Sequence, residues 1–344
     1  MSTITKPGNE TGTDSAVEPA AVSATESTSA SAAASATESP HTAASTSASA
    51  DASDADSTSL PEFTAAPVPM TEEQKFFFDL KGWILVPSVL TETEIEEMKA
   101  EVYAAVKPDY QGKNSDLKQG YQGKLANLLD HPGVVGILNE ILTEPPFVGD
   151  DHYGFRCENS FLMVREPGWE STVKGTGLPH VVRPPQQANA MRYQVQGGKI
   201  FSGLTRVVWE LEEVRAGYGG TSFLSGSHKA HFNYGGPDRY RPNISESPWE
   251  ESLYAAMEDY SCPPGSMLVF TESLIHAAND WTNPDNRRCA VFNCYNSIWA
   301  QWHRLNLDHE IIGKMPPKRQ SLFRGAWQLG GDGNRTYSAD NRSV

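Results

Sequence analysis

The chain has 344 residues, with 43 acidic and 28 basic side chains and a formal net charge of −15. Residues 1–66 contribute −8 of this charge and the remaining residues −7, so neither part has the basic surplus of a nucleic-acid-binding protein. No apolar run reaches the roughly 18 residues that a membrane-spanning helix needs. We therefore expect partners other than nucleic acids and membranes.

Residues 1–66 consist almost entirely of Ser, Ala, Thr, Asp, Glu and Pro, and their first aromatic residue is Phe63. A segment of this composition cannot bury enough apolar surface to offset the entropy that is lost on ordering. We predict a disordered tail over residues 1–66 and one folded domain over residues 67–344. The predicted domain holds all eight Trp and all four Cys of the chain.

The domain is predicted to begin with helices. Thr71 stands three residues before Gln74, and Thr91 stands three residues before Glu94. Both pairs are capping-box patterns, which mark the starts of helices. Apolar residues at helical spacing follow the second box, and we expect a third short helix around residues 134–142.

From about residue 155 the pattern changes to short β-prone runs separated by Gly and Pro clusters. Several short strands of this kind predict a barrel or a double-sheet jelly roll. Helices followed by strands indicate the α+β class, with helices packed outside a β core. The expected strands cover residues 160–164, 200–211, 221–224, 267–270 and 290–295.

The four cysteines are widely spaced and form no C-x-x-C pair, so we expect buried apolar residues rather than zinc ligands or a redox pair. The first residues contain no apolar core of a secretory signal. Both features favour a reducing compartment, and we expect a cytoplasmic protein. The cysteines are Cys157, Cys262, Cys289 and Cys294.

The most specific set of motifs is GGTSFLSGSHK (residues 219–229), then His276, then an arginine eleven residues later, Arg287. With residues 76–102 and 314–323, this set resembles the phytanoyl-CoA dioxygenase-like family of non-haem iron, 2-oxoglutarate-dependent oxygenases. The resemblance extends from about residue 71 to about residue 325. Within GSHK, we interpret the histidine and the lysine as residues that shape a loop.

The resemblance implies a double-stranded β-helix, which is a jelly-roll, cupin-like fold. It also implies Fe(II) held by two histidines and one carboxylate, a facial triad that leaves positions open for 2-oxoglutarate and O2. By the family pattern His276 is the distal histidine, and Trp209 lines the cosubstrate pocket. A structural histidine and a core tryptophan are the alternatives. The implied activity is a hydroxylase-type oxidation of a small organic molecule.

The resemblance also assigns the distal carboxylate of 2-oxoglutarate to Arg287, because arginine bonds a carboxylate bidentately. Adjacent strand residues point to opposite faces, so only one of Arg287 and Arg288 faces inward. The spacing to His276 selects Arg287, and two solvated strand-end arginines are the alternative. Where the family often has a hydroxyl two residues after the distal histidine, this chain has Ala278.

His180 is the histidine at a suitable distance for the proximal metal ligand. His131 lies in the helical region, and His152 precedes the first expected core strand. The family pattern places an acid two residues after the proximal histidine, but that position is Val182, which cannot coordinate a metal. The third ligand position is therefore open.

Three interpretations of this position remain. Another acid completes the triad, with Glu272 first, because it lies four residues before His276, and Glu210 second. Alternatively, two histidines hold iron and an exogenous ligand fills the gap, as in related halogenases, although Val182 would crowd a halide. In the third interpretation the site is degenerate and the barrel is a ligand-binding pseudoenzyme. No sequence feature indicates the oligomeric state. An apolar substrate pocket or the core accounts equally for Trp281, Tyr295, Trp299 and Trp302.

Overall fold

The computed structural model describes residues 63–106, 119–143, 148–170, 192–230, 248–303 and 307–326. These residues all belong to one unit of the chain, Asp56–Val344. Its strands are β1 (Trp83–Val86), β2 (Phe155–Arg165), β3 (Gln194–Gln196), β4 (Lys199–Phe201), β5 (Thr205–Glu210), β6 (Thr221–Phe223), β7 (Ser266–Thr271), β8 (His276–Ala278) and β9 (Arg288–Ser297).

The α-helices lie mainly before and after the strands, so the fold is mixed in helix and strand, as predicted. Short 3-10 helices add to them, including η2 (Gly123–Leu129) and η5 (Ser227–Lys229). The α-helices are α1 (Glu72–Lys81), α2 (Glu92–Ala105), α3 (Pro132–Ile141), α5 (Glu250–Ala255), α6 (His309–Gly313) and α7 (Pro317–Gln320).

The first two helices begin where the capping boxes predict. Thr71 accepts a hydrogen bond from the Gln74 backbone while the Gln74 side chain accepts one from the Thr71 backbone, and Thr91 and Glu94 repeat this exchange. These bonds satisfy N–H groups that a helix start otherwise leaves without partners. Gly82 ends α1 at φ 85°, a left-handed conformation that glycine adopts without strain.

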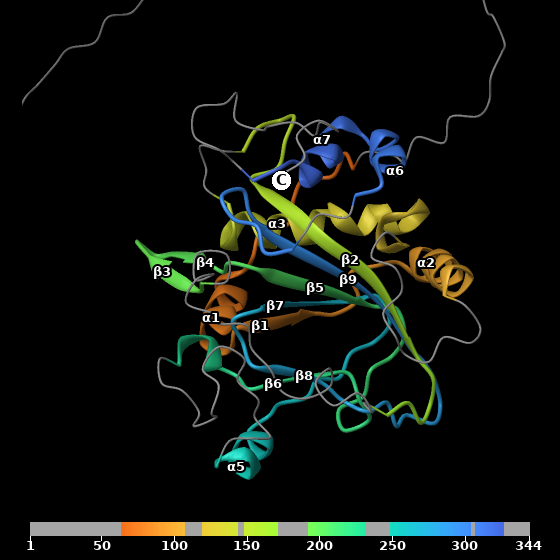
Figure 1. Cartoon of the computed structure of the whole chain (residues 1–344), viewed down its shortest axis with the longest axis vertical. Coiled ribbons are helices and arrows are strands. Elements are labelled where there is room, and N and C mark those ends of the chain that lie inside the picture. Colours follow the sequence, from red (N-terminus) through yellow and green to blue (C-terminus); the bar gives the residue numbers. More distant parts are fainter. Residues whose placement is uncertain are drawn as a thin grey trace, which may run out of the picture. The chain divides into compact units, whose positions relative to one another are not determined.

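The strands form a five-stranded antiparallel sheet in the order β1-β7-β5-β9-β2 and two smaller pairs, β3-β4 and β6-β8 (Figure 1). The predicted strand over residues 200–211 is in fact two strands, β4 and β5, which belong to different sheets. Gly203 lies between them at φ 66° and allows the chain to turn there.

The two faces of the five-stranded sheet carry separate apolar cores. One face packs on α1, α2, α3 and η2, through residues such as Val207 and Val291. The other face packs on the β6-β8 pair, through Trp83, Val208, Phe270 and Phe292, and we call it the inner face. Because strand residues alternate between faces, this assignment fixes which side chains of β5 and β9 reach the inner face.

Strand β2 contains a bulge. Cys157 pairs with Tyr295 and Asn159 pairs with Cys294, so Glu158 is an extra residue between two consecutive pairs. The side chain of Glu158 is nevertheless fully buried. Its carboxylate therefore requires partners from another part of the chain.

All four cysteines are buried and unbonded to one another, as predicted. Within the described ranges, no helix is both long and apolar enough to cross a membrane. Of the predicted tail, only residues 63–66 fall within the described part of the chain.

Candidate active site

His276 is the first residue of β8 and points toward the inner face. Its ring lies 4.9 Å from the ring of Phe270, and the residue is only 7% exposed. Nδ1 lies 2.8 Å from the carbonyl oxygen of Leu274. Because a carbonyl only accepts, Nδ1 carries a proton, and in the neutral ring the lone pair is then on Nε2. A histidine held in this tautomer by a backbone carbonyl has the form in which histidines ligate metals.

Glu272 lies beside His276, as the sequence interpretation expected. It is 4% exposed, and its Oε2 lies 3.7 Å from Nε2 of His276. Neighbouring ligands about 2.1 Å from one ion in a facial triad are separated by about 3.0 Å. The two atoms therefore suit a shared cation after a small adjustment.

The other predicted metal ligand, His180, and Val182 lie outside the described residues. Within the described residues, no group of three or more His, Cys, Asp or Glu side chains is placed to hold a metal ion. The candidate metal ligands within the described residues are thus His276 and Glu272, and their assignment as ligands stays a prediction, as does that of His180.

Arg206, on β5, holds the other oxygen of Glu272. Its Nε and Nη2 each lie 2.7 Å from Oε1 of Glu272. The guanidinium also lies 5.3 Å from the ring of Phe161. Burial opposes the charge of Arg206, yet Cys294 and Glu272 together raise its pKa above the ordinary value. This arginine has no counterpart among the residues that the sequence motifs singled out.

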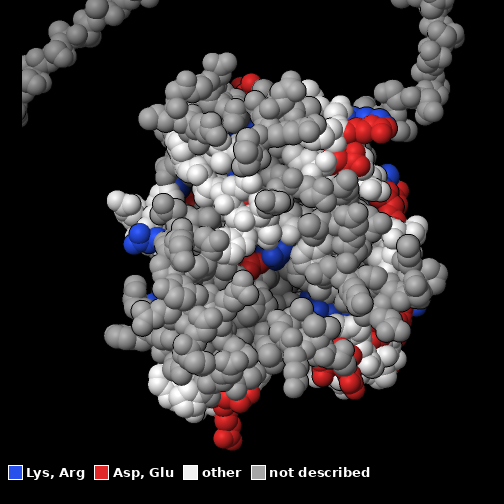
Figure 2. Space-filling model, in the orientation of Figure 1, with Lys and Arg blue, Asp and Glu red and all other residues white. Residues whose placement is uncertain are grey.

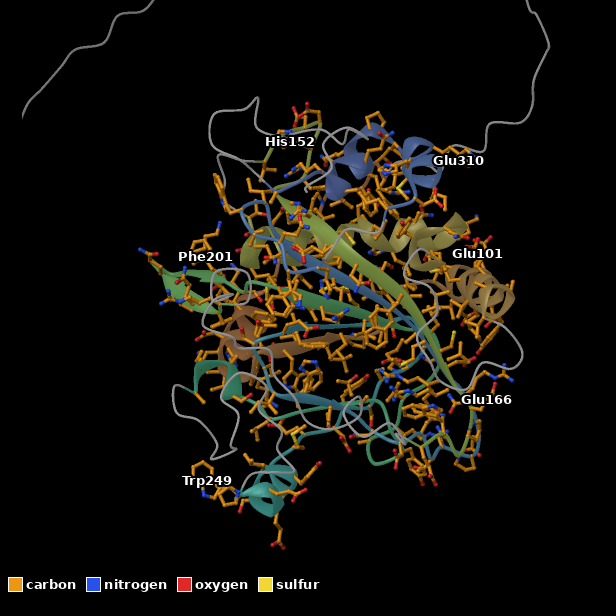
Figure 3. All side chains as sticks on the ribbon, viewed as in Figure 1. Glu101, His152, Glu166, Phe201, Trp249 and Glu310 are labelled. Carbon is orange, nitrogen blue, oxygen red and sulfur yellow. The ribbon has the colours of Figure 1, made fainter. Side chains whose placement is uncertain are left out.

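Of the two neighbouring arginines, Arg288 faces inward and Arg287 faces outward, which is the opposite of the prediction. Arg287 precedes β9, is largely exposed, and lies 3.5 Å from Glu166 and 5.0 Å from the ring of Tyr103. Glu166 lies at the edge of the fold in Figure 3. Arg288 is the first residue of β9, and alternation from Phe292 places it on the inner face with no exposed surface. The prediction that Arg287 faces inward was wrong.

Arg288 is already paired with an acid of the chain. Its Nε donates to Oε2 of Glu210 at 3.2 Å, and its Nη2 donates to Oε1 of Glu210. The hydroxyl of Tyr260 donates to the same Oε1 at 2.6 Å. Burial and the nearby Glu210 raise the pKa of Tyr260 well above its usual range, so the phenol stays protonated as a donor.

Trp209 also differs from its prediction as a residue that lines the cosubstrate pocket. Alternation on β5 turns it to the helix side of the sheet, where it is fully buried and lies 5.4 Å from the ring of His131. Glu210, its neighbour, faces inward instead. Trp209 is therefore a core residue, which was the alternative interpretation.

The aromatic residues before, in and after β9 divide between core and surface. Trp281 and Tyr295 are fully buried, and the Tyr295 hydroxyl donates to the Leu129 carbonyl on the helix side. Trp299 is 47% exposed. Trp302 packs on Leu204, Cys294 and Ala300.

This last cluster borders the Glu272–Arg206 pair. Leu204 accepts the Glu272 backbone N–H, and Cys294 is the strand partner of Arg206. Trp302 packs against the cluster that contains both residues, so the loop 298–303 lies near the pair.

Buried charges of β2 hold this loop. The Glu158 carboxylate accepts the backbone N–H groups of Trp302 and His303 at 3.0–3.1 Å. Arg156 donates to the Ala300 carbonyl at 2.7 Å. No sequence motif marked these two residues, because their partners lie more than 140 positions away.

His228 and Lys229 of the GSHK motif shape a loop, as interpreted. His228 lies with Nε2 3.0 Å from the carbonyl oxygen of Asp79, and the Lys229 ammonium lies 2.7 Å from the Asp79 carboxylate. These contacts fix η5 on the C-terminal end of α1.

On the face drawn in Figure 2, the described Lys and Arg side chains occur singly and close to acidic side chains rather than as a continuous basic area. Some exposed basic side chains are paired with acids, for example Arg215 with Glu213 and Asp285 at 2.7–2.8 Å.

The family model of phytanoyl-CoA dioxygenase (PhyH) matches residues 78–289. The crystal structure of HygX from Streptomyces hygroscopicus, with nickel and 2-oxoglutarate bound, matches with a TM-score of 0.52 and 15% identity, covering 80% of this chain and 95% of HygX. The HygX structure that also contains hygromycin B gives a TM-score of 0.51 at 15% identity, with the same coverage. The carbocyclase SnoK from nogalamycin biosynthesis gives 0.48 at 18% identity, covering 73% of this chain and 95% of SnoK. No curated protein sequence matches this chain.

Proposed function

Because the chain belongs to the phytanoyl-CoA dioxygenase family, we propose that it is an Fe(II)- and 2-oxoglutarate-dependent oxygenase that acts on a small organic molecule. The corresponding architecture is a double-stranded β-helix formed by the five-stranded sheet and the β6-β8 pair. The observation that carries the proposal is the pair His276 and Glu272 at one end of the inner face.

In this proposal Nε2 of His276 and Oε2 of Glu272 hold the iron, and His180 is the third ligand. The bound iron supplies activation of O2, with 2-oxoglutarate as the co-reductant. The protein supplies the tautomer of His276 through the Leu274 carbonyl, and it holds Glu272 in place through Arg206. The aromatic inner face, including Phe270, keeps bulk water from this end of the barrel.

The small-molecule substrate class is supported by the family and by the neighbouring structures. The HygX crystals contain nickel, 2-oxoglutarate and hygromycin B. A carboxylate beside His276 also weighs against the halogenase-like alternative, because a halide needs a ligand position that no carboxylate fills.

A second candidate function is a ligand-binding barrel without oxygenase activity. The observation that favours it is the Arg288–Glu210 pair, since an arginine on the inner face of β9 is bonded by a carboxylate of the chain itself. Val182, in place of the expected acid, points in the same direction.

One spectroscopic experiment separates the two candidates. Anaerobic addition of Fe(II) and 2-oxoglutarate to the full chain should produce the weak visible charge-transfer band of a chelate complex, and release of CO2 from 2-oxoglutarate should follow when air is admitted. His276→Ala should abolish both signals. A full-length protein that shows no band and no CO2 release contradicts the oxygenase and supports the binding barrel.

Mn(II) titration tests whether Glu272 is a ligand of the metal. If Glu272 completes the site, Glu272→Ala should abolish metal retention and Val182→Asp should weaken it by crowding. If the third position is open, Val182→Asp should instead strengthen Mn(II) binding, because it adds a charged oxygen ligand. The opposite signs distinguish these interpretations by isothermal titration.

A further inference from the structure

A dicarboxylic cosubstrate needs a cation for its distal carboxylate, and the inner face offers Arg288, Arg165 and Arg206. The guanidinium of Arg288 bonds both oxygens of Glu210 and has no exposed surface. An incoming carboxylate would have to displace Glu210 and leave that acid buried without its partner, which is costly. Arg288 is therefore neutralised before any ligand arrives.

Arg165 is also committed to the protein. It is the strand partner of Arg288 on β2, its Nη1 donates to the Asn279 carbonyl at 3.0 Å, and its guanidinium stacks 3.9 Å from the Trp169 ring. Stacking of this kind fixes the plane of an arginine over the aromatic ring.

Arg206 differs from Arg288 because one edge of its guanidinium is unused, and from Arg165 because it lies beside Glu272. The Nε–Nη2 edge of its guanidinium bonds Oε1 of Glu272. Its Nη1 is buried and has no hydrogen-bond partner among the described residues. Buried donors are rarely left without a partner, and the Nη1–Nη2 edge of an arginine matches the two oxygens of a carboxylate.

The position of Arg206 suits a ligand that also reaches the metal ligands. Glu272 bridges the two sites, with Oε1 2.7 Å from Arg206 and Oε2 3.7 Å from Nε2 of His276. The charges of the site also favour a dianionic ligand. A divalent cation beside Arg206 and Glu272 leaves two positive charges in a buried space, and a dianionic ligand balances them.

We propose that Arg206 binds the distal carboxylate of 2-oxoglutarate in this protein, in place of an arginine on β9. The inference rests on the proposed oxygenase function and assigns the cosubstrate-binding cation within it. Arg206 then has two partners, Glu272 on one edge of the guanidinium and the cosubstrate on the other.

The test compares two ligands that differ only at the distal end, 2-oxoglutarate and 2-oxopentanoate, which has a methyl group in place of the distal carboxylate. Binding of each to the full chain loaded with Mn(II) is measured by isothermal titration calorimetry. Arg206→Gln should weaken 2-oxoglutarate binding at least about tenfold. It should weaken 2-oxopentanoate binding clearly less, because both ligands share any loss that comes through Glu272 and only 2-oxoglutarate has the group that Arg206 recognises.

Two further variants identify the arginine. Arg287→Gln, the exposed control, should change neither affinity. Glu210→Gln frees Arg288 from its acid and should leave 2-oxoglutarate binding unchanged. If Glu210→Gln strengthens 2-oxoglutarate binding while Arg206→Gln has no effect, the cosubstrate binds Arg288 and the inference is wrong.

The outcomes also separate the inference from the proposed function. If the unmodified protein binds 2-oxoglutarate but Arg206→Gln weakens both ligands equally, Arg206 acts only through Glu272 and the inference alone fails. If the unmodified, Mn(II)-loaded protein binds neither ligand, the proposed function fails and the inference fails with it. Circular dichroism of Arg206→Gln confirms that the variant compared is folded.

Discussion

The Glu210–Arg288 pair makes a quantitative prediction for stability. Glu210→Ala removes an acceptor of three hydrogen bonds, two from Arg288 and one from Tyr260. The remaining contacts of the guanidinium, to the Tyr260 hydroxyl at 3.3 Å, Thr221 Oγ1 at 3.4 Å and Met163 Sδ at 3.7 Å, are weak and reach only uncharged acceptors, so they do not replace a carboxylate. A buried charge that loses its partner costs about 3–5 kcal/mol, and we expect this loss in the free energy of unfolding.

The measurement is urea unfolding followed by tryptophan fluorescence. The matched control is Glu166→Ala, which removes the partner of the exposed Arg287 and should cost about 0–1 kcal/mol. A double variant, Glu210→Leu with Arg288→Met, removes both charges and should recover most of the stability that the single variant loses, because apolar replacements of buried pairs are often neutral.

The comparison between the single and double variants decides the reasoning. If Glu210→Ala costs less than about 1.5 kcal/mol, or if the double variant is no more stable than the single one, Arg288 is not held by this pair. The argument that Arg288 is unavailable to a ligand would then fall as well.

Three further predictions concern the fold. Gly136→Ala should lower the free energy of unfolding by about 1–3 kcal/mol or more, measured by thermal unfolding, because a Cβ would lie 1.7 Å from the Val68 carbonyl oxygen. Gly313→Ala, whose Cβ would have no atom within 4 Å, should change the free energy of unfolding by under about 1 kcal/mol. Native protein at pH 8 should not react with a thiol reagent until it is unfolded, because burial raises the pKa of Cys157, Cys262 and Cys289 to about 12; rapid labelling would contradict this. Deletion of residues 1–66 should leave the thermal midpoint unchanged, and a clear drop would show that these residues stabilise the domain.

Local signals in the sequence predicted the helices well. The capping boxes at Thr71 and Thr91 depend on side chains only three residues away, so their information is contained in the sequence itself. The pairing of His276 with Glu272 was predictable for the same reason, because four residues separate them across one turn after β7.

The sequence could not indicate which side chains of the strands face inward. Strands β5 and β9 are buried on both faces, so polar and apolar residues do not alternate along them. Without that alternation, the spacing from His276 selected Arg287, and Trp209 was assigned to the inner face. In both cases the wrong one of two adjacent strand residues was assigned to the inner face.

Arg206 and Glu158 were missed for a different reason. Each bonds a partner distant in sequence, Glu272 for Arg206 and the Trp302 backbone for Glu158, and neither lies in a recognisable motif. Pairing of this kind depends on sheet order, which brings β5 beside β7 and β2 beside β9.

The bulge at Glu158 bears on how this fold can diversify. Because Cys157 and Asn159 pair with consecutive residues of β9, loss of the Glu158 codon would close the ladder into a regular strand pair without turning any side chain to the opposite face. The same loss would release the backbone of Trp302 and His303, in the loop whose Trp302 packs against the cluster of Leu204, Cys294 and Ala300. A single-codon deletion can therefore alter the loop 298–303 while the pairing of β2 with β9 is kept, so the surroundings of Glu272 and the sheet can change independently.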